Sequence, residues 1–294
     1  MRMKKREALQ GLLCVLPVLF LLLLIRGYPL ADTFIKSFTK WDGFNKPDFV
    51  GFSNYINMFQ SSDFLLSLSN NFIFLLHIPV KIVIAMIFAF SLYEKAPGWK
   101  IFRNISFIPQ VISATIIGYL FCILFGFQGP INNILSGIGL DFLAIDWLGE
   151  RWTSIAVIFI CITWHGIGYL SLIILGGLSS VPDSVFEAAR IDGANYWQRL
   201  FHIVIPMLVR TVEYIVIMNI TWIFTGLFSF IFTITRGGPG YDTSTIDYLI
   251  YNKAFVTGNQ MGMASAMAVV LLAVVLVITV LQLKASDKMD DWSG

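Results

Sequence analysis

The sequence predicts an all-α integral membrane protein with six transmembrane helices, and both composition and hydropathy lead to this prediction. Of the 294 residues, 57% are hydrophobic and only 13% are charged, and the mean hydropathy is +0.76. Soluble domains carry roughly 25% charged residues. Apolar stretches of about 20 residues recur along the chain, each long enough to cross a hydrocarbon core of about 30 Å as a helix.

We expect a single membrane domain over residues 1–294, with spans at residues 11–34, 72–92, 105–125, 154–178, 211–235 and 263–283. The first span could be read as a cleaved signal peptide, because a basic cluster from Arg2 to Arg6 precedes it. No small-x-small cleavage site follows, and the apolar character continues past Arg26 as far as Ile35, which favours a retained helix.

The basic residues predict the orientation of the spans. The loops on the side of the two termini hold 11 Lys and Arg residues, against 6 on the other side. Short basic loops stay in the cytoplasm. Both termini are therefore predicted to be cytoplasmic, as is the segment between the fourth and fifth spans.

Motifs for catalysis and cofactor binding are missing from the sequence. It contains no G-x-x-x-x-G-K-[ST] phosphate cradle, no H-E-x-x-H, no C-x-x-C and no G-x-S-x-G, and His77, His165 and His202 are scattered. The sequence thus predicts no catalytic residues, no metal ligands and no cofactor. With a formal charge of +2 and dispersed basic residues, we expect no nucleic-acid partner.

Residues 184–193 of the predicted cytoplasmic loop have the pattern of a complete short helix. Ser184 is placed to cap its first turn with Glu187 returning a bond to the cap, and Gly193 is placed to stop it. So short a helix is unstable alone in water, so it needs a surface to dock on. Ala188 and Ala189 would allow the close approach of another backbone. An amphipathic loop resting on the membrane is the alternative.

This segment resembles the EAA motif of the membrane subunits of binding-protein-dependent ABC importers. The resemblance is carried by Glu187-Ala188-Ala189, by Gly193 six residues after the glutamate, and by an I-x-I-P ending at Pro206 where the family usually has I-x-L-P. In that family the motif forms a coupling helix seated on the ATPase subunit. The resemblance implies that the ATPase contacts are Glu187, Ala188, Ala189, Asp192, Gly193 and Pro206.

Other segments are similar to sugar-importer permeases of the maltose-permease type, so the resemblance covers nearly the whole chain. Their first outer loop is similar to three segments of this chain, the Y-P-L at residues 28–30, residues 37–43 and residues 49–55. Their T-x-G-G-P motif is similar to T-R-G-G-P at residues 235–239, and the start of their third span is similar to F-I-P at residues 107–109.

The resemblance implies a type I ABC importer permease fold in the inner membrane of a bacterium or archaeon. It implies as partners a second homologous permease subunit, two ATPase subunits and an extracellular sugar-binding protein, with a sugar or oligosaccharide as substrate. ATP and Mg²⁺ would bind to the ATPase subunits and not to this chain. ATP-driven closure of the ATPase would move the coupling helices and open the pathway outward.

Polar and aromatic residues within the spans are the candidates for the substrate pathway, because such residues are costly against lipid. They are Gln110, Ser113, Asn219, Trp222, Thr225, Gly226, Phe228 and Ser229. Four of them, from Asn219 to Ser229, recur at i, i+3, i+7 and i+10 and are expected to form one helical stripe. Helix packing is the alternative role for Asn219 and Gly226. The maltose-type pattern has adjacent amides at the position of Gly226 and Leu227, which argues against maltose-like contacts.

Lys81 is expected either to face a cavity, where it would suit an acidic saccharide, or to snorkel to the outer surface. Arg210 and Glu213 are expected to form a structural pair.

Three other functions fit the sequence less well. An ion-driven carrier would also be a six-helix apolar chain, but only Glu213 offers an intramembrane carboxylate. An intramembrane enzyme lacks a nucleophile and base, and a structural scaffold does not explain the predicted cytoplasmic helix.

Overall fold

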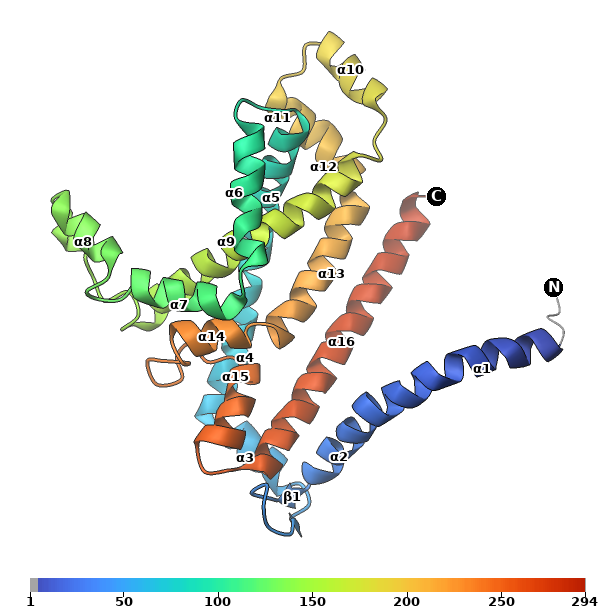
Figure 1. Ribbon diagram of the computed structural model, residues 1–294, viewed down its shortest axis with the longest axis vertical. Coiled ribbons are helices and arrows are strands. Elements are labelled where there is room, and N and C mark those ends of the chain that lie inside the picture. The colour runs from blue at the N-terminus through green and yellow to red at the C-terminus, as the bar shows by residue number, and fades with distance from the viewer. Residues whose placement is uncertain (1–4, 294) are drawn as a thin grey trace. The chain divides into compact units, whose positions relative to one another are not determined.

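The computed structural model describes the backbone of residues 5–293 and the side chains of residues 11–285 (Figure 1). Arg2 and Lys4, which were counted for the orientation, lie outside the described residues, as do the side chains of Lys5, Arg6 and Lys288. Within the described part, four helices are long and apolar enough to cross a membrane, and two bent helix pairs bring the number to six if each pair is one span.

The chain divides into two compact units, and the predicted single domain stays a prediction. The first comprises the residues up to Ser61 together with Ile250–Ala273, and the second comprises Ser62–Leu249 together with the residues from Val274 onward.

In the first unit, a helical segment runs without interruption from α1 (Lys5–Leu22) through a π-helical turn η1 (Leu23–Gly27) into α2 (Tyr28–Lys36). Pro29, which lacks an N–H and clashes with the preceding turn, accounts for the widened turn before it. The remaining elements are the antiparallel strands β1 (Thr39–Lys40) and β2 (Asp48–Phe49), α3 (Ser53–Gln60), η4 (Asn252–Val256) and the first part of α16 (Met261–Ser293).

A turn that follows β1 is built on Asp42. Its Oδ1 accepts the backbone N–H groups of Phe44 at 3.0 Å and Asn45 at 2.8 Å. These bonds, with one from the Asn45 side chain, lower the pKa of Asp42 to about 2, because they favour the charged carboxylate.

In the second unit, the main helices are α4 (Ser62–Leu75) and α5 (His77–Tyr93), which together form one span, and α9 (Arg151–Leu178). The second span therefore begins ten residues before its predicted start. Between them lie α6 (Trp99–Val111), α7 (Ala114–Leu124), α8 (Pro130–Gly137) and the 3₁₀ turn η2 (Asp141–Leu143). After α9 come α10 (Asp183–Ile191), α11 (Tyr196–Arg199), the π-helical turn η3 (Leu200–Val204), α12 (Ile205–Met207), α13 (Val209–Thr225), α14 (Phe228–Ile234) and α15 (Ile246–Tyr251).

The third and fifth predicted spans are not continuous helices, and on this point the sequence prediction was wrong. The chain bends by 103° between α6 and α7, where Ile112 and Ser113 are extended. The fifth predicted span, residues 211–235, is broken at Gly226, where α13 ends instead of continuing to residue 235. A further bend of 72° lies before that span, between α12 and α13, two residues after Pro206. Hydropathy reports that a stretch is apolar but not that its backbone is straight, so these breaks were not predicted.

Two buried asparagines near the start of the second span join α4 to distant parts of this unit. Asn70 donates from Nδ2 to the carbonyls of Asp242 and Ser244, each at 2.9 Å, and Arg151 donates to its Oδ1 at 2.9 Å. Asn71 donates to the carbonyl of Ile223 at 2.9 Å and accepts the N–H of Ile246 at 3.0 Å. Neither residue was among those predicted from the sequence to have a role.

The core of the second unit lies where α5, α9, η3 and the start of α13 meet. Close helix approach is permitted by glycines: a Cβ on Gly168 of α9 would collide with the backbone of Ser106 in α6, and one on Gly118 of α7 with Thr233 in α14. Within this unit α4 and α10 lie at opposite ends (Figure 1).

Candidate functional site

The short helix predicted at residues 184–193 is α10, Asp183–Ile191. Its predicted stop is confirmed: Gly193 has φ +78°, Gly193 N–H donates to the carbonyl of Arg190 at 3.1 Å, and Ala194 N–H donates to that of Ala189 at 2.9 Å. These two bonds close the helix end as in a Schellman motif, which requires a left-handed residue at this position.

The predicted cap of α10 was wrong. Pro182 occupies the N-cap in an extended conformation, no side chain caps the helix, and Ser184 lies inside the first turn. Asp183 supplies negative charge at the helix start instead. The capping box belongs to the next helix, where Asn195 Oδ1 accepts Gln198 N–H at 2.9 Å and Gln198 Oε1 accepts Asn195 N–H at 2.8 Å.

One face of α10 is packed against the chain's own core. Phe186 is 2% exposed, and its ring lies with its centroid 5.1 Å from that of Tyr93 and 6.2 Å from that of Phe90. Ala189, one turn later, is also buried. The side chain of Ala189 therefore faces inward, so only Ala188 of the predicted alanine pair is available to another protein.

The other face of α10 is exposed and includes Glu187 and Ala188, and Asp192 and Gly193, directly after the helix, are exposed as well. Ile191 is also on this face and is 87% exposed. Ile191 was not among the predicted ATPase contacts. The signal for it was available: an isoleucine between charged residues, five positions from the buried Phe186 and thus on a different face of the helix.

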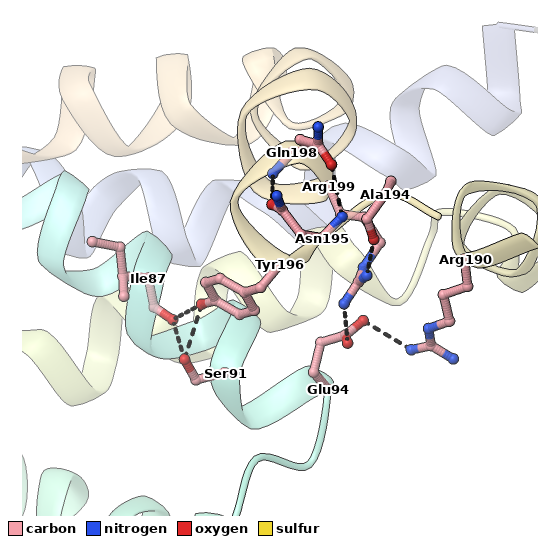
Figure 2. A network of polar contacts seen from close by, with 9 residues as sticks. All are labelled: Ile87, Ser91, Glu94, Arg190, Ala194, Asn195, Tyr196, Gln198 and Arg199. Atoms are coloured by element: carbon pink, nitrogen blue, oxygen red, sulfur yellow. Dashed lines mark hydrogen bonds and ion pairs between the residues drawn. The ribbon is translucent and has the colours of Figure 1, made fainter. Parts of the chain in front are cut away.

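Three charged residues, which we call the Glu94 clamp, fix α10 and α11 to the end of α5 (Figure 2). Arg190 donates to Glu94 Oε1 and Arg199 donates to Glu94 Oε2, both at 2.8 Å. The Glu94–Arg199 pair is the more buried, with side-chain exposures of 13% and 12%, whereas Arg190 is 52% exposed. The hydrogen bond and charge of Glu94 raise the pKa of Arg190.

Tyr196 makes a second connection to α5 beside the Glu94 clamp. Its hydroxyl donates to the carbonyl of Ile87 at 2.9 Å and lies 2.9 Å from the hydroxyl of Ser91 (Figure 2). Arg199 also donates to the carbonyl of Ala194. The loop that carries α10 is thus bonded on both sides of Gly193 to the same span. Pro206, the last of the predicted ATPase contacts, lies apart from α10 in the sequence, exposed in α12.

A cavity of about 170 Å³ lies between spans of the second unit. Its lining contains three of the predicted pathway residues, Gln110, Asn219 and Trp222, together with residues from the second and fourth spans. The full lining is Lys81, Gln110, His165, Gly166, Tyr169, Leu170, Met218, Asn219 and Trp222. The other predicted pathway residues, Ser113, Thr225, Gly226, Phe228 and Ser229, do not line it.

The predicted stripe from Asn219 to Ser229 is not formed, because the helix that would carry it ends at Gly226. Gly226 has φ −125° and ψ 0°, and a Cβ there would collide with the indole of Trp222. Gly226 thus makes room for Trp222 instead of joining it on a face. Ser229 belongs to α14, which begins at Phe228 after the break.

Lys81 faces this cavity and does not snorkel. It is only 5% exposed, its Nζ donates to Asn219 Oδ1 at 3.2 Å, and the same atom lies 5.4 Å from the centre of the Trp222 ring. The predicted pair of Arg210 and Glu213 is confirmed, with Arg210 Nη1 3.3 Å from Glu213 Oε2.

Residues 81–290, which include both α10 and the whole cavity lining, match the family described as binding-protein-dependent transport system inner membrane component. This chain belongs to that family. The predicted resemblance and the inner-membrane location are thereby confirmed, and the chain is a membrane component of a binding-protein-dependent transport system.

Relatives of this permease are similar along almost their whole length. It is 32% identical over 280 residues to the probable ABC transporter permease protein YurN of Bacillus subtilis, covering 92% of this chain and 95% of that protein. It is 32% identical over 267 residues to the multiple sugar-binding transport system permease protein MsmF of Streptococcus mutans, covering 90% of each.

The fold of the permease is also that of a solved transporter. A chain in the crystal structure of a bacterial alginate ABC transporter, in complex with an alginate pentasaccharide-bound periplasmic protein, matches with a TM-score of 0.82. The match covers 97% of this permease and 96% of that chain at 23% identity. It confirms the predicted type I permease fold.

Proposed function

We propose that this permease is one of two channel-forming subunits of an ATP-driven importer that accepts a sugar or oligosaccharide from an extracellular binding protein. Its partners are a second homologous permease, two ATPase subunits and that binding protein. The permease itself catalyses no reaction and binds no cofactor, because ATP and Mg²⁺ are held by the ATPase subunits.

The observation that carries this proposal is the construction of α10. Phe186 anchors one face of the helix in the core and the Glu94 clamp fixes its C-terminal half, while Ile191 and Glu187 are left exposed on the other. A rigid helix that is bonded to a membrane span and docked on a moving ATPase converts rotation of the ATPase into movement of the span. An amphipathic loop lying loosely on the membrane would need no such clamp.

The substrate class is supported by the relatives and by the cavity. MsmF is named for a multiple sugar-binding transport system, and the solved transporter was crystallised with a binding protein that holds a pentasaccharide. In this permease, the cavity between the spans offers amide, hydroxyl and aromatic groups, which are the groups that replace water around sugar hydroxyls and pack on sugar rings. The remaining predicted pathway residues, from Ser113 to Ser229, stay candidates for the route beyond it.

The test begins with purification of the tagged permease from native membranes in mild detergent, followed by a count of the subunits by intact-complex mass spectrometry. We expect two ATPase subunits and a second permease. Gly193→Asp should weaken ATPase retention or uncouple hydrolysis from uptake, because any side chain at φ +78° strains the helix end.

Gly139→Asp is the matched control. Gly139 has φ +79°, and a Cβ at either glycine meets no atom within 4 Å, so the substitution brings similar backbone strain to a loop far from α10 in the sequence. Recovery of the wild-type chain without any ATPase, or equal effects of the two substitutions on coupling, would contradict the proposal.

A further inference from the structure

The cavity at Lys81 has an uncompensated positive charge. None of its nine lining residues is a carboxylate, and among the described residues Lys81 forms no ion pair. An ammonium group has three N–H donors, and the described residues supply Nζ with one acceptor, Asn219 Oδ1. A charge held between membrane spans is costly unless a partner compensates it, which makes such a residue a candidate for function.

The position of the ammonium group is built by its neighbours. Asn219 donates from Nδ2 to the carbonyl of Ile215 at 2.8 Å, which turns its Oδ1 toward Lys81. Gly166 gives the space, since a Cβ at that position would collide with Nζ and Cε of Lys81. The Trp222 ring lies 5.4 Å from Nζ, within the range of a cation–π contact. A lysine that merely filled space would not need an oriented amide and a glycine opposite its charge.

The rest of the lining favours acceptors on the ligand. Gln110, His165, Tyr169 and Trp222 each have a group able to donate a hydrogen bond, and two of them, Gln110 and Tyr169, are also exposed. The volume of 170 Å³ corresponds to about five or six waters. It therefore suits one acidic group and the edge of its ring and is too small for a whole oligosaccharide.

We propose that this cavity is a subsite for the carboxylate of an anionic saccharide, with Lys81 as its counter-charge. The proposal rests on the proposed function, because it specifies the chemistry of the sugar that the importer carries. A carboxylate entering the cavity accepts from Nζ and from the neighbouring donors, so the charge of Lys81 is compensated only while substrate is bound.

The experiment measures ATP-dependent uptake by the complete complex with its binding protein in proteoliposomes. The probes are uronate di- and trisaccharides, each compared with its own methyl ester, which has nearly the same shape and no charge. The variants are Lys81→Met and Lys81→Arg. Lys100→Met is the control, since Lys100 also lies near a tryptophan ring, at 5.8 Å, but is exposed.

We expect the wild-type complex to prefer the uronates, and Lys81→Met to reduce their uptake by about tenfold or more, since hydrogen bonds to charged groups are the strong ones. Uptake of the esters should change little, and Lys81→Arg should keep part of the preference. If Lys81→Met does not assemble, Gly166→Ala serves instead, because it displaces the ammonium without removing the charge. It should raise the KM for uronates and not for esters.

The outcomes separate the two proposals. Wild-type uptake of neutral saccharides only, or an equal effect of Lys81→Met on acids and esters, overturns the subsite and leaves the sugar importer standing. Loss of the second permease from the Lys81→Met complex, together with a wild-type KM for uronates in Gly166→Ala, shows that Lys81 pairs with that subunit and also overturns the subsite. No ATP-dependent uptake of any saccharide by the wild-type complex overturns the proposed function itself.

Discussion

Glu94→Gln should release α10 from the end of the second span. The substitution keeps the size of the side chain but removes the charge that holds Arg190 and Arg199, each 2.8 Å away. Removing one partner of a buried ion pair costs about 3–5 kcal/mol, whereas an exposed pair contributes about 0.2–1 kcal/mol. Because Glu94 and Arg199 are 13% and 12% exposed and not fully buried, we expect loss of their ion pair to cost about 2–3 kcal/mol. Loss of the ion pair with the half-exposed Arg190 adds about 0.5 kcal/mol.

This sum of about 3 kcal/mol corresponds to an increase on the order of 100-fold in the opening equilibrium of α10, at 1.36 kcal/mol for each factor of ten. Hydrogen–deuterium exchange of the backbone amides of residues 184–193 in the purified complex measures it directly. Arg190→Ala, which leaves the Glu94–Arg199 pair, should accelerate exchange only about two- to threefold. Hydrolysis without matching uptake should accompany the Glu94→Gln change.

Glu150→Gln is the control for this experiment, since Glu150 is an exposed carboxylate outside the coupling loop and forms no ion pair within the described residues. It should leave exchange in α10 unchanged. Protection of residues 184–193 that stays at the wild-type level in Glu94→Gln would refute the role assigned to the clamp. The helix would then be held by the packing of Phe186 alone.

Three further predictions follow from other parts of the structure. Ile191→Ser should weaken retention of the ATPase by on the order of 30-fold, because burying such a side chain contributes about 2 kcal/mol; Ile138→Ser, at a residue 65% exposed, should have no effect in the same pull-down titration. Asn71→Ala should lower the free energy of unfolding by about 2–4 kcal/mol by leaving two buried backbone groups unpaired; thermal unfolding of the complex, with Asn57→Ala as an exposed control, checks this. Burial raises the pKa of Asp247 above its ordinary 3.8, so stability should fall as pH rises from 3.8 through the raised value, and Asp247→Asn should remove this dependence of the unfolding midpoint on pH.

Features that depend on residues close together in the chain were predicted well from the sequence. The positive φ of Gly193 follows from the pattern of a short helix that stops, and the pair of Arg210 and Glu213 follows from their spacing of three. The cap predicted at Ser184 shows the limit even here, because the side-chain cap is found instead at Asn195 of the next helix. Ser184 is of a good capping type, but the extended Pro182 occupies the N-cap position and leaves Ser184 inside the first turn.

Contacts between distant segments could not be predicted from the sequence. Nothing in the neighbourhood of Glu94 indicates that its partners are 96 and 105 residues away, and nothing near Lys81 indicates an amide 138 residues away. Ala189 was expected to face a partner protein and faces the core instead, because the packing of Phe186 sets the rotation of α10.

The sequence by itself determined that the chain is a six-span membrane protein of the ABC importer type with a short helix in the loop after the fourth span. Hydropathy and local motifs are properties of contiguous residues, so no folding is needed to see them. Only the tertiary structure decided that the third and fifth spans are broken, that one carboxylate clamps the coupling loop, and that Lys81 is directed into a cavity. These features arise from side chains of separate spans that meet only when the helices pack, and a broken helix is stable only where that packing satisfies its freed backbone groups.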